Sequence, residues 1–144
     1  EDNGMNYIDR VETDWAFRIQ LPIGTNVPFH CTASGKCFLS SLKKREINGI
    51  LSSIKLEAIT EKTHVTPEGL MQELNQIKKQ GYALDREEFM EGMIAIAVPI
   101  KDREDRFVGA LAFHGPTQRI SIENAVARKE ILLRASQKLR EHLF

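Results

Sequence analysis

Residues 93–115 read MIAIAVPIKDREDRFVGALAFHG and carry the clearest strand signals of the chain. Its two flanks, 93–100 and 106–115, are apolar and rich in residues that favour strands, and the charged segment KDRED separates them. Two such runs joined by a short polar segment are typical of a β-hairpin. The sequence therefore predicts two antiparallel strands, the second of which ends at Gly115-Pro116.

The segments on either side of the hairpin carry signals for helices. Thr66 stands as an N-cap before Pro67 at the first helical position, and Gly81 is suited to a left-handed C-cap. Thr32 and Ser121 are further N-cap candidates, each followed by apolar residues at helical spacing. These signals predict helices over about 33–42, 43–51, 67–80 and 122–142.

Partial alternation of apolar and polar residues predicts two more strands near the start of the chain, at 6–11 and 16–21. Trp15, between them, is expected to cover a sheet edge or a subunit contact. Strands that pair locally, with helices packed outside them, indicate an antiparallel α+β domain. The sequence shows no βαβ order and no Gly-x-Gly-x-x-Gly motif, so a Rossmann fold has no support.

The 144 residues have the size and composition of one soluble globular domain, with 42% hydrophobic and 28% charged residues. Lys and Arg total 20, as do Asp and Glu, so no net basic field attracts nucleic acid. The sequence contains no apolar run long enough to cross a bilayer, and its acidic, polar start is not a signal peptide. With only two cysteines as well, we expect a cytoplasmic protein with no membrane partner.

The stretch HCTASGKCF at 30–38 raises the question of a phosphate-binding loop. A Walker loop needs Gly-x-x-x-x-Gly-Lys followed by Ser or Thr, since its glycines let backbone N–H groups surround the phosphate. Alignment on Gly35-Lys36 puts His30 at the first glycine and Cys37 at the hydroxyl residue. The stretch is therefore not a P-loop, and Lys36, on the first turns of a helix, is expected to point to solvent.

The two cysteines of this stretch, Cys31 and Cys37, lie six residues apart, and the histidines outside it are scattered along the chain. No standard zinc spacing is met, so no metal site is expected. Free cysteine is among the most buried residue types, and both residues are interpreted as small buried apolar groups. Thiol redox chemistry between them is the alternative.

Four segments, in this order, resemble the effector-binding domain of the IclR family of bacterial transcription regulators: NYIDRVET, VPFHCTASGKCFLSSL, ELNQIKKQGYALDREEFMEGMIAIAVPIKD and FVGALAFHGPTQRIS. The family pattern has Leu-Pro-x-His-x-(Thr/Ser)-Ala-x-Gly-Lys-Ala-Leu-Leu, Arg-x-x-Gly-Tyr-(Ala/Ser)-x-Asp-x-Glu-Glu and a final Ser-Gly-Pro-x-x-Arg-(Ile/Leu). The Gly-Tyr-Ala-Leu-Asp-Arg-Glu-Glu run at 81–88 is the most specific part of a resemblance that covers nearly the whole chain.

The resemblance implies a GAF-like fold, in which a curved antiparallel sheet is flanked by helices and has a pocket on its concave face. It implies that residues 1–144 form a non-enzymatic sensing domain, without catalytic residues or cofactor, in a homodimer or homotetramer. The pocket is expected to bind a small organic or aromatic acid. Operator DNA is expected to be bound only by a missing N-terminal winged helix-turn-helix domain. The abrupt start in EDNG suggests a fragment that also lacks the start of its own domain.

Ala33, Ser34 and Gly35 follow a helix N-cap, where free backbone N–H groups and partial positive charge suit a carboxylate. In the resembled family, the two residues before Gly-Lys line the effector pocket, and here these are Ala33 and Ser34. Small residues at this point also permit close packing of the helix on the sheet. With the resemblance, the stretch is interpreted as an anion-holding helix start.

Asp85 occupies the position of the family's pocket aspartate, where it could accept a hydrogen bond from an effector hydroxyl or a water. Its alternative is a solvated carboxylate within a run of charges. Ala95, Ala112 and His114 stand where family members contact ligand, in some cases through Cys and Ser. The alanines imply a wider, more apolar pocket, and hence an acid larger than two or three carbons. His114 is either a donor to the ligand or a core histidine bonded to a backbone carbonyl.

Two alternatives to an effector sensor stay open at this point. A GAF-like domain can support thiol redox chemistry, as an enzyme or a sensor, with Cys31 and Cys37 as the candidate pair. A disulfide between them would need Cα atoms closer than about 7 Å. The domain could also be an oligomerisation module without a ligand, and a collapsed pocket around Ala95 and Ala112 would favour that interpretation.

Overall fold

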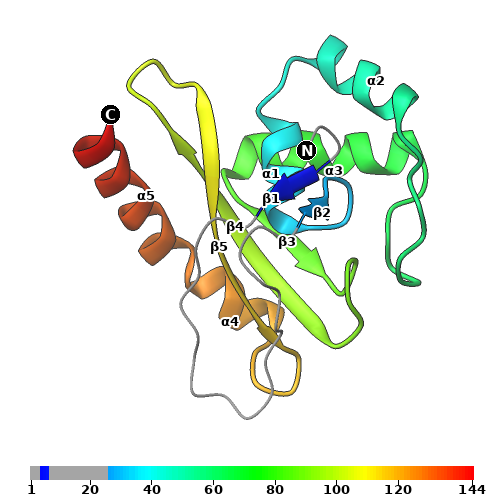
Figure 1. Ribbon diagram of the computed structural model, residues 1–144. Coiled ribbons are helices and arrows are strands. Elements are labelled where there is room, and N and C mark those ends of the chain that lie inside the picture. The colour runs from blue at the N-terminus through cyan, green and yellow to red at the C-terminus, as the bar shows by residue number, and fades with distance from the viewer. Residues whose placement is uncertain (1–3, 7–25) are drawn as a thin grey trace.

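The computed structural model describes residues 4–6 and 26–144 (Figure 1). Most of the strand predicted at 6–11, the strand predicted at 16–21 and Trp15 lie outside the described residues. The described elements, in chain order, are β1 (Gly4–Asn6), β2 (Asn26–Pro28), α1 (Ala33–Ser40), α2 (Lys44–Ser53), α3 (Pro67–Gln80), β3 (Ala83–Arg86), β4 (Met93–Lys101), β5 (Phe107–Pro116), α4 (Ile122–Ala127) and α5 (Lys129–Leu143).

The predicted caps bound the helices as expected. Oγ1 of Thr32 accepts the N–H of Gly35 at 3.0 Å, and Oγ1 of Thr66 accepts the N–H of Gly69 at 3.1 Å. Gly81 ends α3 with a φ of 86°, a left-handed conformation that glycine adopts without steric cost. The helices predicted over 33–42, 43–51 and 67–80 are therefore confirmed, with small shifts at their ends.

The central sheet contains β3, β4 and β5 in that order, and all neighbours are antiparallel. The predicted hairpin is confirmed, since Ala95 pairs with His114 and Met93 pairs with Pro116 at the end of β5. β1 and β2 form a separate two-stranded antiparallel sheet. The predicted α+β class with antiparallel strands is thus confirmed for the described part of the chain.

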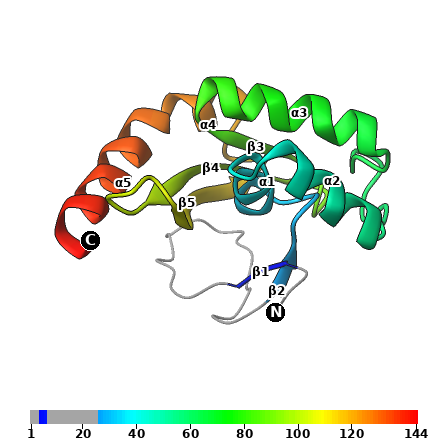
Figure 2. The same ribbon diagram turned by 90° about the horizontal axis from the view of Figure 1, so that it is seen from above.

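The sheet separates two apolar clusters, because successive side chains of a strand point to opposite faces. On one face, Ala95 and Ala97 of β4 pack in a cluster with Leu74 of α3 and residues of α1. On the other face, Ile96 packs in a cluster with Leu132 of α5 and residues of α4. Figure 2 shows α3, α4 and α5 following one another along an arc, with β4 and β5 inside it. Because α1 and α3 contribute to one cluster and α4 and α5 to the other, helices cover both faces of β4.

The last helix differs from its prediction. Instead of one helix over 122–142, the chain forms α4 and α5, which meet at Arg128. The Arg128 guanidinium lies over the Phe113 ring, 4.7 Å from its centroid. Ala125 and Leu132, on either side of the break, pack into the same apolar cluster on the sheet. In the described part of the chain, no helix is long and apolar enough to span a membrane.

Candidate functional site

A cavity lies between the start of α1 and the face of the sheet that carries Ala95. Six of the seven residues predicted for the site line it: Ala33, Ser34, Asp85, Ala95, Ala112 and His114. They come from α1 and from all three strands of the central sheet, so folding brings together what the sequence separates. Thr32, Phe89 and Met93 complete the lining.

The cavity is small. Its volume of about 20 Å³ is about that needed for one water molecule. Phe89 and Met93, which the sequence did not reveal as lining residues, contribute large side chains beside the small Ala95 and Ala112. No periodicity marks these two, because one lies in the turn after β3 and the other is the first residue of β4. A cavity this small does not match the wide pocket that the alanines led us to expect.

The helix start forms one polar wall. Helix geometry leaves the N–H groups of Ala33 and Ser34 without intrahelical acceptors, because the first four N–H groups of any helix have none. Both residues line the cavity, so this end of the α1 dipole faces it. An anion in the cavity would be favoured there.

Gly35 does not line the cavity. A Cβ atom built on it would lie 2.6 Å from the Cα and carbonyl oxygen of Phe29 and from Oγ1 of Thr32. Gly35 therefore lets the chain before α1 approach the helix closely. This is the packing role that the sequence offered as the alternative to holding an anion.

Asp85 forms the opposite polar wall. It lies on β3 with its side chain 2% exposed, whereas Leu84 packs into the cluster on the other face of the sheet. The interpretation of Asp85 as a solvated carboxylate is therefore wrong. Burial raises the pKa of Asp85 to about 7, the neighbouring Glu88 carboxylate acts in the same direction, and the N–H of Glu88, which donates to Asp85 Oδ1 at 2.8 Å, opposes them.

Asp85, Ala95 and His114 form one row across the sheet, because Asp85 pairs with Ala95 and Ala95 pairs with His114. The strands that carry Asp85 and His114, β3 and β5, are separated by β4 and are therefore about 10 Å apart, twice the usual strand spacing. Nδ1 of His114 lies 3.4 Å from Sδ of Met93, so the histidine ring also contacts a residue that fills the cavity. The polar side chains of Asp85 and His114 thus lie on either side of the small apolar Ala95.

The prediction that Lys36 points to solvent is wrong. Its side chain is 0% exposed, and Nζ donates to the carbonyl oxygen of Leu84 at 2.6 Å and to both carboxylate oxygens of Glu88 at 2.7 and 2.9 Å. Nζ also donates to the carboxylate of Glu73 on α3. The carboxylates compensate the cost of burying the ammonium group. Glu73 and Glu88 lie 37 and 52 residues from Lys36 in the sequence, so no local sequence pattern predicts these contacts.

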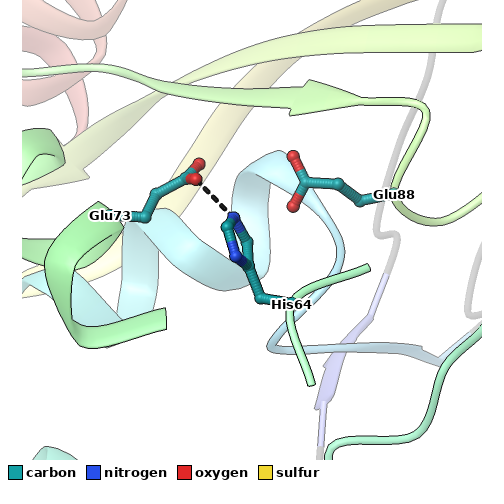
Figure 3. A group of neighbouring side chains, drawn as sticks. All are labelled: His64, Glu73 and Glu88. Atoms are coloured by element: carbon teal, nitrogen blue, oxygen red, sulfur yellow. Dashed lines mark hydrogen bonds and ion pairs between the residues drawn. The ribbon is translucent and has the colours of Figure 1, made fainter. Parts of the chain in front are cut away.

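The polar cluster around Lys36 continues to the surface. Nε2 of His64 lies 2.7 Å from Oε1 of Glu73, and the His64 side chain is 31% exposed (Figure 3). Burial opposes ionisation of Glu73, but the Lys36 ammonium and hydrogen bonds from Lys36 and His64 outweigh it and hold the pKa of Glu73 below its usual range. The carbonyl of Glu88 accepts a hydrogen bond from Thr63 Oγ1 at 2.6 Å.

His64, Glu73 and Glu88 offer donor atoms within 4.8 Å of one another, which raises the question of a metal ion (Figure 3). The Lys36 ammonium already bonds to both carboxylates of this group. Because that ammonium supplies the positive charge a metal ion would bring, we assign the cluster to Lys36 and assign no metal site here.

The two cysteines behave as buried apolar groups, as predicted. Cys31 and Cys37 are both free and buried. Burial raises the pKa of each thiol to about 12. The thiolate is the reactive form of cysteine, so neither thiol is poised for redox chemistry at neutral pH.

A second, larger hollow was not anticipated from the sequence. It has a volume of about 290 Å³ and lies between the segment before α1 and the segment after α2, with Phe29, His30, Lys55 and Glu57 in its lining. Nε2 of His30 bonds to the carbonyl oxygen of Glu57 at 2.8 Å and so links the two segments.

Comparison with known proteins identifies the family of the chain. Residues 1–141 match the family model described as bacterial transcriptional regulator IclR C-terminal. The HTH-type transcriptional regulator KdgR of Escherichia coli is 32% identical over 139 residues, which cover 96% of this chain and 53% of that protein. The chain spans about half the length of the curated relatives it matches.

Solved structures share the fold. The C-terminal domain of E. coli KdgR has a TM-score of 0.77 at 34% identity, covering 83% of this chain and 73% of that one. Thermotoga maritima IclR has a TM-score of 0.89 at 29% identity, covering 96% and 56%. A PobR double-mutant inducer-binding domain from Acinetobacter, in complex with 3-hydroxybenzoic acid, has a TM-score of 0.87 at 24% identity, covering 97% and 83%; this last likeness shows the fold alone.

The relatives are transcriptional regulators, a family that is not enzymatic, so the alternative of a thiol enzyme is set aside. The solved structures confirm the predicted α+β fold. Sequence and fold agree over nearly the whole chain, which therefore belongs to the IclR family of bacterial transcriptional regulators and corresponds to its C-terminal domain.

Proposed function

We propose that this domain senses a small organic or aromatic acid, which binds in the cavity between α1 and the β3–β5 sheet. The observation that carries the proposal is that six residues chosen from the sequence line a single cavity. In this proposal the domain acts in the cytoplasm, and binding modulates operator recognition by an N-terminal helix-turn-helix domain of the same protein. The relatives, about twice as long as this chain, support such a second domain.

The chemistry of the lining supports an acid as the ligand. A carboxylate would accept hydrogen bonds from the N–H groups of Ala33 and Ser34 at the positive end of α1. Asp85 and His114 would bind a hydroxyl or a second polar group from opposite sides. Ala95 between them would contact the hydrocarbon part of the ligand, and the width of this row suits a ring better than a two-carbon acid.

Binding in this proposal requires the cavity to open. Because the present volume holds about one water molecule, an acid must displace Phe89 or Met93. A ligand that binds the open arrangement better than the closed one shifts the domain towards the open arrangement. In a homodimer or homotetramer, that shift would change how two DNA-binding domains are held relative to each other.

A thermal-shift screen tests the proposal. The panel contains glyoxylate, pyruvate, benzoate and 3-hydroxybenzoate, applied to the wild-type domain and to Asp85→Ala and His114→Ala. A ligand at 100 times its Kd stabilises the folded state by about 2.7 kcal/mol, so we expect a clear shift with an aromatic acid that both substitutions remove. Tight binding of only the two- and three-carbon acids would contradict the ligand class, and no shift with any acid would contradict the sensor.

The small cavity favours a second candidate, a ligand-free oligomerisation module. In that case the domain would associate in the same way with and without every acid. Sedimentation velocity with each acid of the panel separates the two candidates. An unchanged association state together with an unchanged melting temperature supports the module.

A further inference from the structure

Lys36 connects the two polar walls of the cavity although it does not line the cavity itself. It belongs to α1, three residues after Ala33 and two after Ser34. Its ammonium bonds to the carbonyl of Leu84, the residue before Asp85, and to the carboxylate of Glu88, three residues after Asp85. The segment that carries Asp85 is therefore held to α1 on both sides of the aspartate.

The hydrogen bonds of Glu88 carry this connection directly to Asp85. The N–H of Glu88 donates to Asp85 Oδ1 at 2.8 Å, and Oε2 of Glu88 accepts the N–H of Arg86 at 3.0 Å. The orientation of the Asp85 carboxylate thus depends on Glu88, whose own carboxylate is fixed by Lys36. A buried ammonium that bonds to three groups leaves little freedom to any of them.

The segment after β3 needs such an anchor. Glu87 has a φ of 59°, in the left-handed region that is uncommon for residues other than glycine. The side chain of Glu87 pairs with Lys62, which is 59% exposed. The side chain of the neighbouring Glu88 instead bonds to Lys36 of α1. Exposed ion pairs of that kind contribute little to stability. The buried Lys36 ammonium therefore links the segment to α1 through its hydrogen bonds to both Glu88 carboxylate oxygens.

We propose that Lys36 is the positioning residue of the effector cavity: its buried ammonium sets the separation and orientation of the helix start and the Asp85 carboxylate that bind the acid. The inference rests on the proposed function for its ligand, while the positioning itself is a property of the empty domain. The ammonium acts here as an internal cation in a group of donors, His64, Glu73 and Glu88, that lie within 4.8 Å of one another.

That donor group provides a specific rescue. In Lys36→Ala the ammonium is gone, and the donor atoms of His64, Glu73 and Glu88 are left close together. Zn²⁺ binds His nitrogen and carboxylate oxygen at about 2.0–2.2 Å, so a small movement would bring the three donors around one ion. None of the three donors belongs to α1, so an ion there would restore a cation beside the Glu88 carboxylate, which orients Asp85, without restoring the contact with α1.

The experiment compares wild type, Lys36→Met, Lys36→Ala and the matched control Lys62→Met, which breaks the neighbouring exposed pair with Glu87. Lys36→Met keeps the length of the side chain and removes its charge. The first measurement needs no ligand: two-dimensional amide NMR and hydrogen exchange of residues 33–35 and 85–88. The second measures the affinity for benzoate and 3-hydroxybenzoate by calorimetry under conditions where each variant is folded.

We expect Lys36→Met to shift the amide signals of both segments, to speed exchange of the Arg86 and Glu88 amides at least tenfold, and to weaken acid binding at least tenfold. Lys62→Met should leave amide exchange and acid binding unchanged, with signal shifts confined to its partner Glu87. Equimolar Zn²⁺ should restore the signals of residues 85–88, but not those of residues 33–35, in Lys36→Ala. It should fail to do so when His64→Ala is added, and it should leave the wild type unchanged.

Wild-type exchange rates of the Arg86 and Glu88 amides in Lys36→Met would overturn the inference, as would Zn²⁺ that binds Lys36→Ala without restoring the signals of residues 85–88. If the wild type binds none of the acids, the proposed function fails, but the NMR measurements still decide whether Lys36 positions Asp85. The two failures are therefore distinguishable.

Discussion

Nζ of Lys36 lies 2.7 Å from Oε1 of Glu88 inside the domain, although 52 residues separate them in the chain. This contact joins the helix start that forms one wall of the cavity to the segment that forms the other. It has a neighbour, the pair between Lys62 and Glu87, that has the same chemistry and length but is exposed to solvent. The two pairs therefore permit a matched test of what burial adds to an ion pair.

Lys36→Met is predicted to lower the free energy of unfolding by about 3–5 kcal/mol, because it leaves the buried Glu88 carboxylate and the partly buried Glu73 carboxylate without their ammonium partner. Lys62→Met is predicted to cause no measurable loss, since its pair is solvated. Urea unfolding of both variants at pH 7 checks the difference. Equal losses in the two would show that burial does not distinguish the pairs.

The stability of the domain is predicted to depend on the protonation of Asp85. Its pKa is raised from 3.8 to about 7 in the folded state, so between these values the folded state binds more protons than the unfolded one. The favourable contribution is complete below pH 3.8 and is lost as the pH rises through about 7. For a shift of this size, the loss between pH 5 and pH 8 is about 2.5 kcal/mol.

Asp85→Asn provides the control for this pH dependence, because asparagine can still accept the N–H of Glu88 but does not titrate. The variant should lack the loss between pH 5 and pH 8 and should be more stable than the wild type at pH 8. The measurement is urea unfolding at several pH values. Parallel pH profiles for the two proteins would mean that Asp85 does not carry the raised pKa.

Gly35→Ala is predicted to destabilise the domain by about 1–3 kcal/mol, the usual cost of overpacking. A Cβ atom there would lie 2.6 Å from backbone atoms of Phe29, which cannot give way as a flexible side chain could. Gly49 in α2 offers the opposite case, since nothing lies within 4 Å of a Cβ built on it. Gly49→Ala should raise stability by about 0.5–1 kcal/mol. Thermal unfolding of both variants checks the signs.

Cys31 and Cys37 are predicted to react slowly with a thiol reagent in the folded domain. Both are buried, and burial raises the pKa of each thiol to about 12, so the thiolate is scarce at pH 8. Two thiols should react at once in denaturant and none rapidly in native buffer. Peroxide treatment should leave both titratable after denaturation. Loss of both thiols on oxidation would revive the redox interpretation.

Much of the fold follows from local signals in the sequence. Thr32, Thr66 and Gly81 bound their helices as predicted, because a cap needs only the residues of one turn. The β4–β5 hairpin follows from two apolar runs around a charged segment. The break at Arg128 was not predicted, because apolar residues recur at helical spacing through 122–142 and no Gly or Pro in that range marks an interruption.

The site was only partly predictable. The resemblance selected Asp85 and His114 for the cavity, but the partners that bury Lys36 come from two distant elements and obey no spacing rule. The size of the cavity depends on how Phe89 and Met93 are oriented, which no sequence pattern specifies. Local structure is thus encoded within a turn or a hairpin, whereas the packing of the site is encoded by contacts across the chain.

Binding of an aromatic acid in the cavity is tested most directly by titrating the ¹⁵N-labelled domain with 3-hydroxybenzoate and benzoate and recording amide NMR spectra. We expect saturable shifts confined to the lining of the cavity, with the largest at Ala33, Ser34, Asp85 and His114, and their loss in Asp85→Ala. Saturable shifts around His30 and Glu57 instead would move the ligand to the larger hollow. No saturable shift with either acid would contradict the proposal that this cavity binds an aromatic acid.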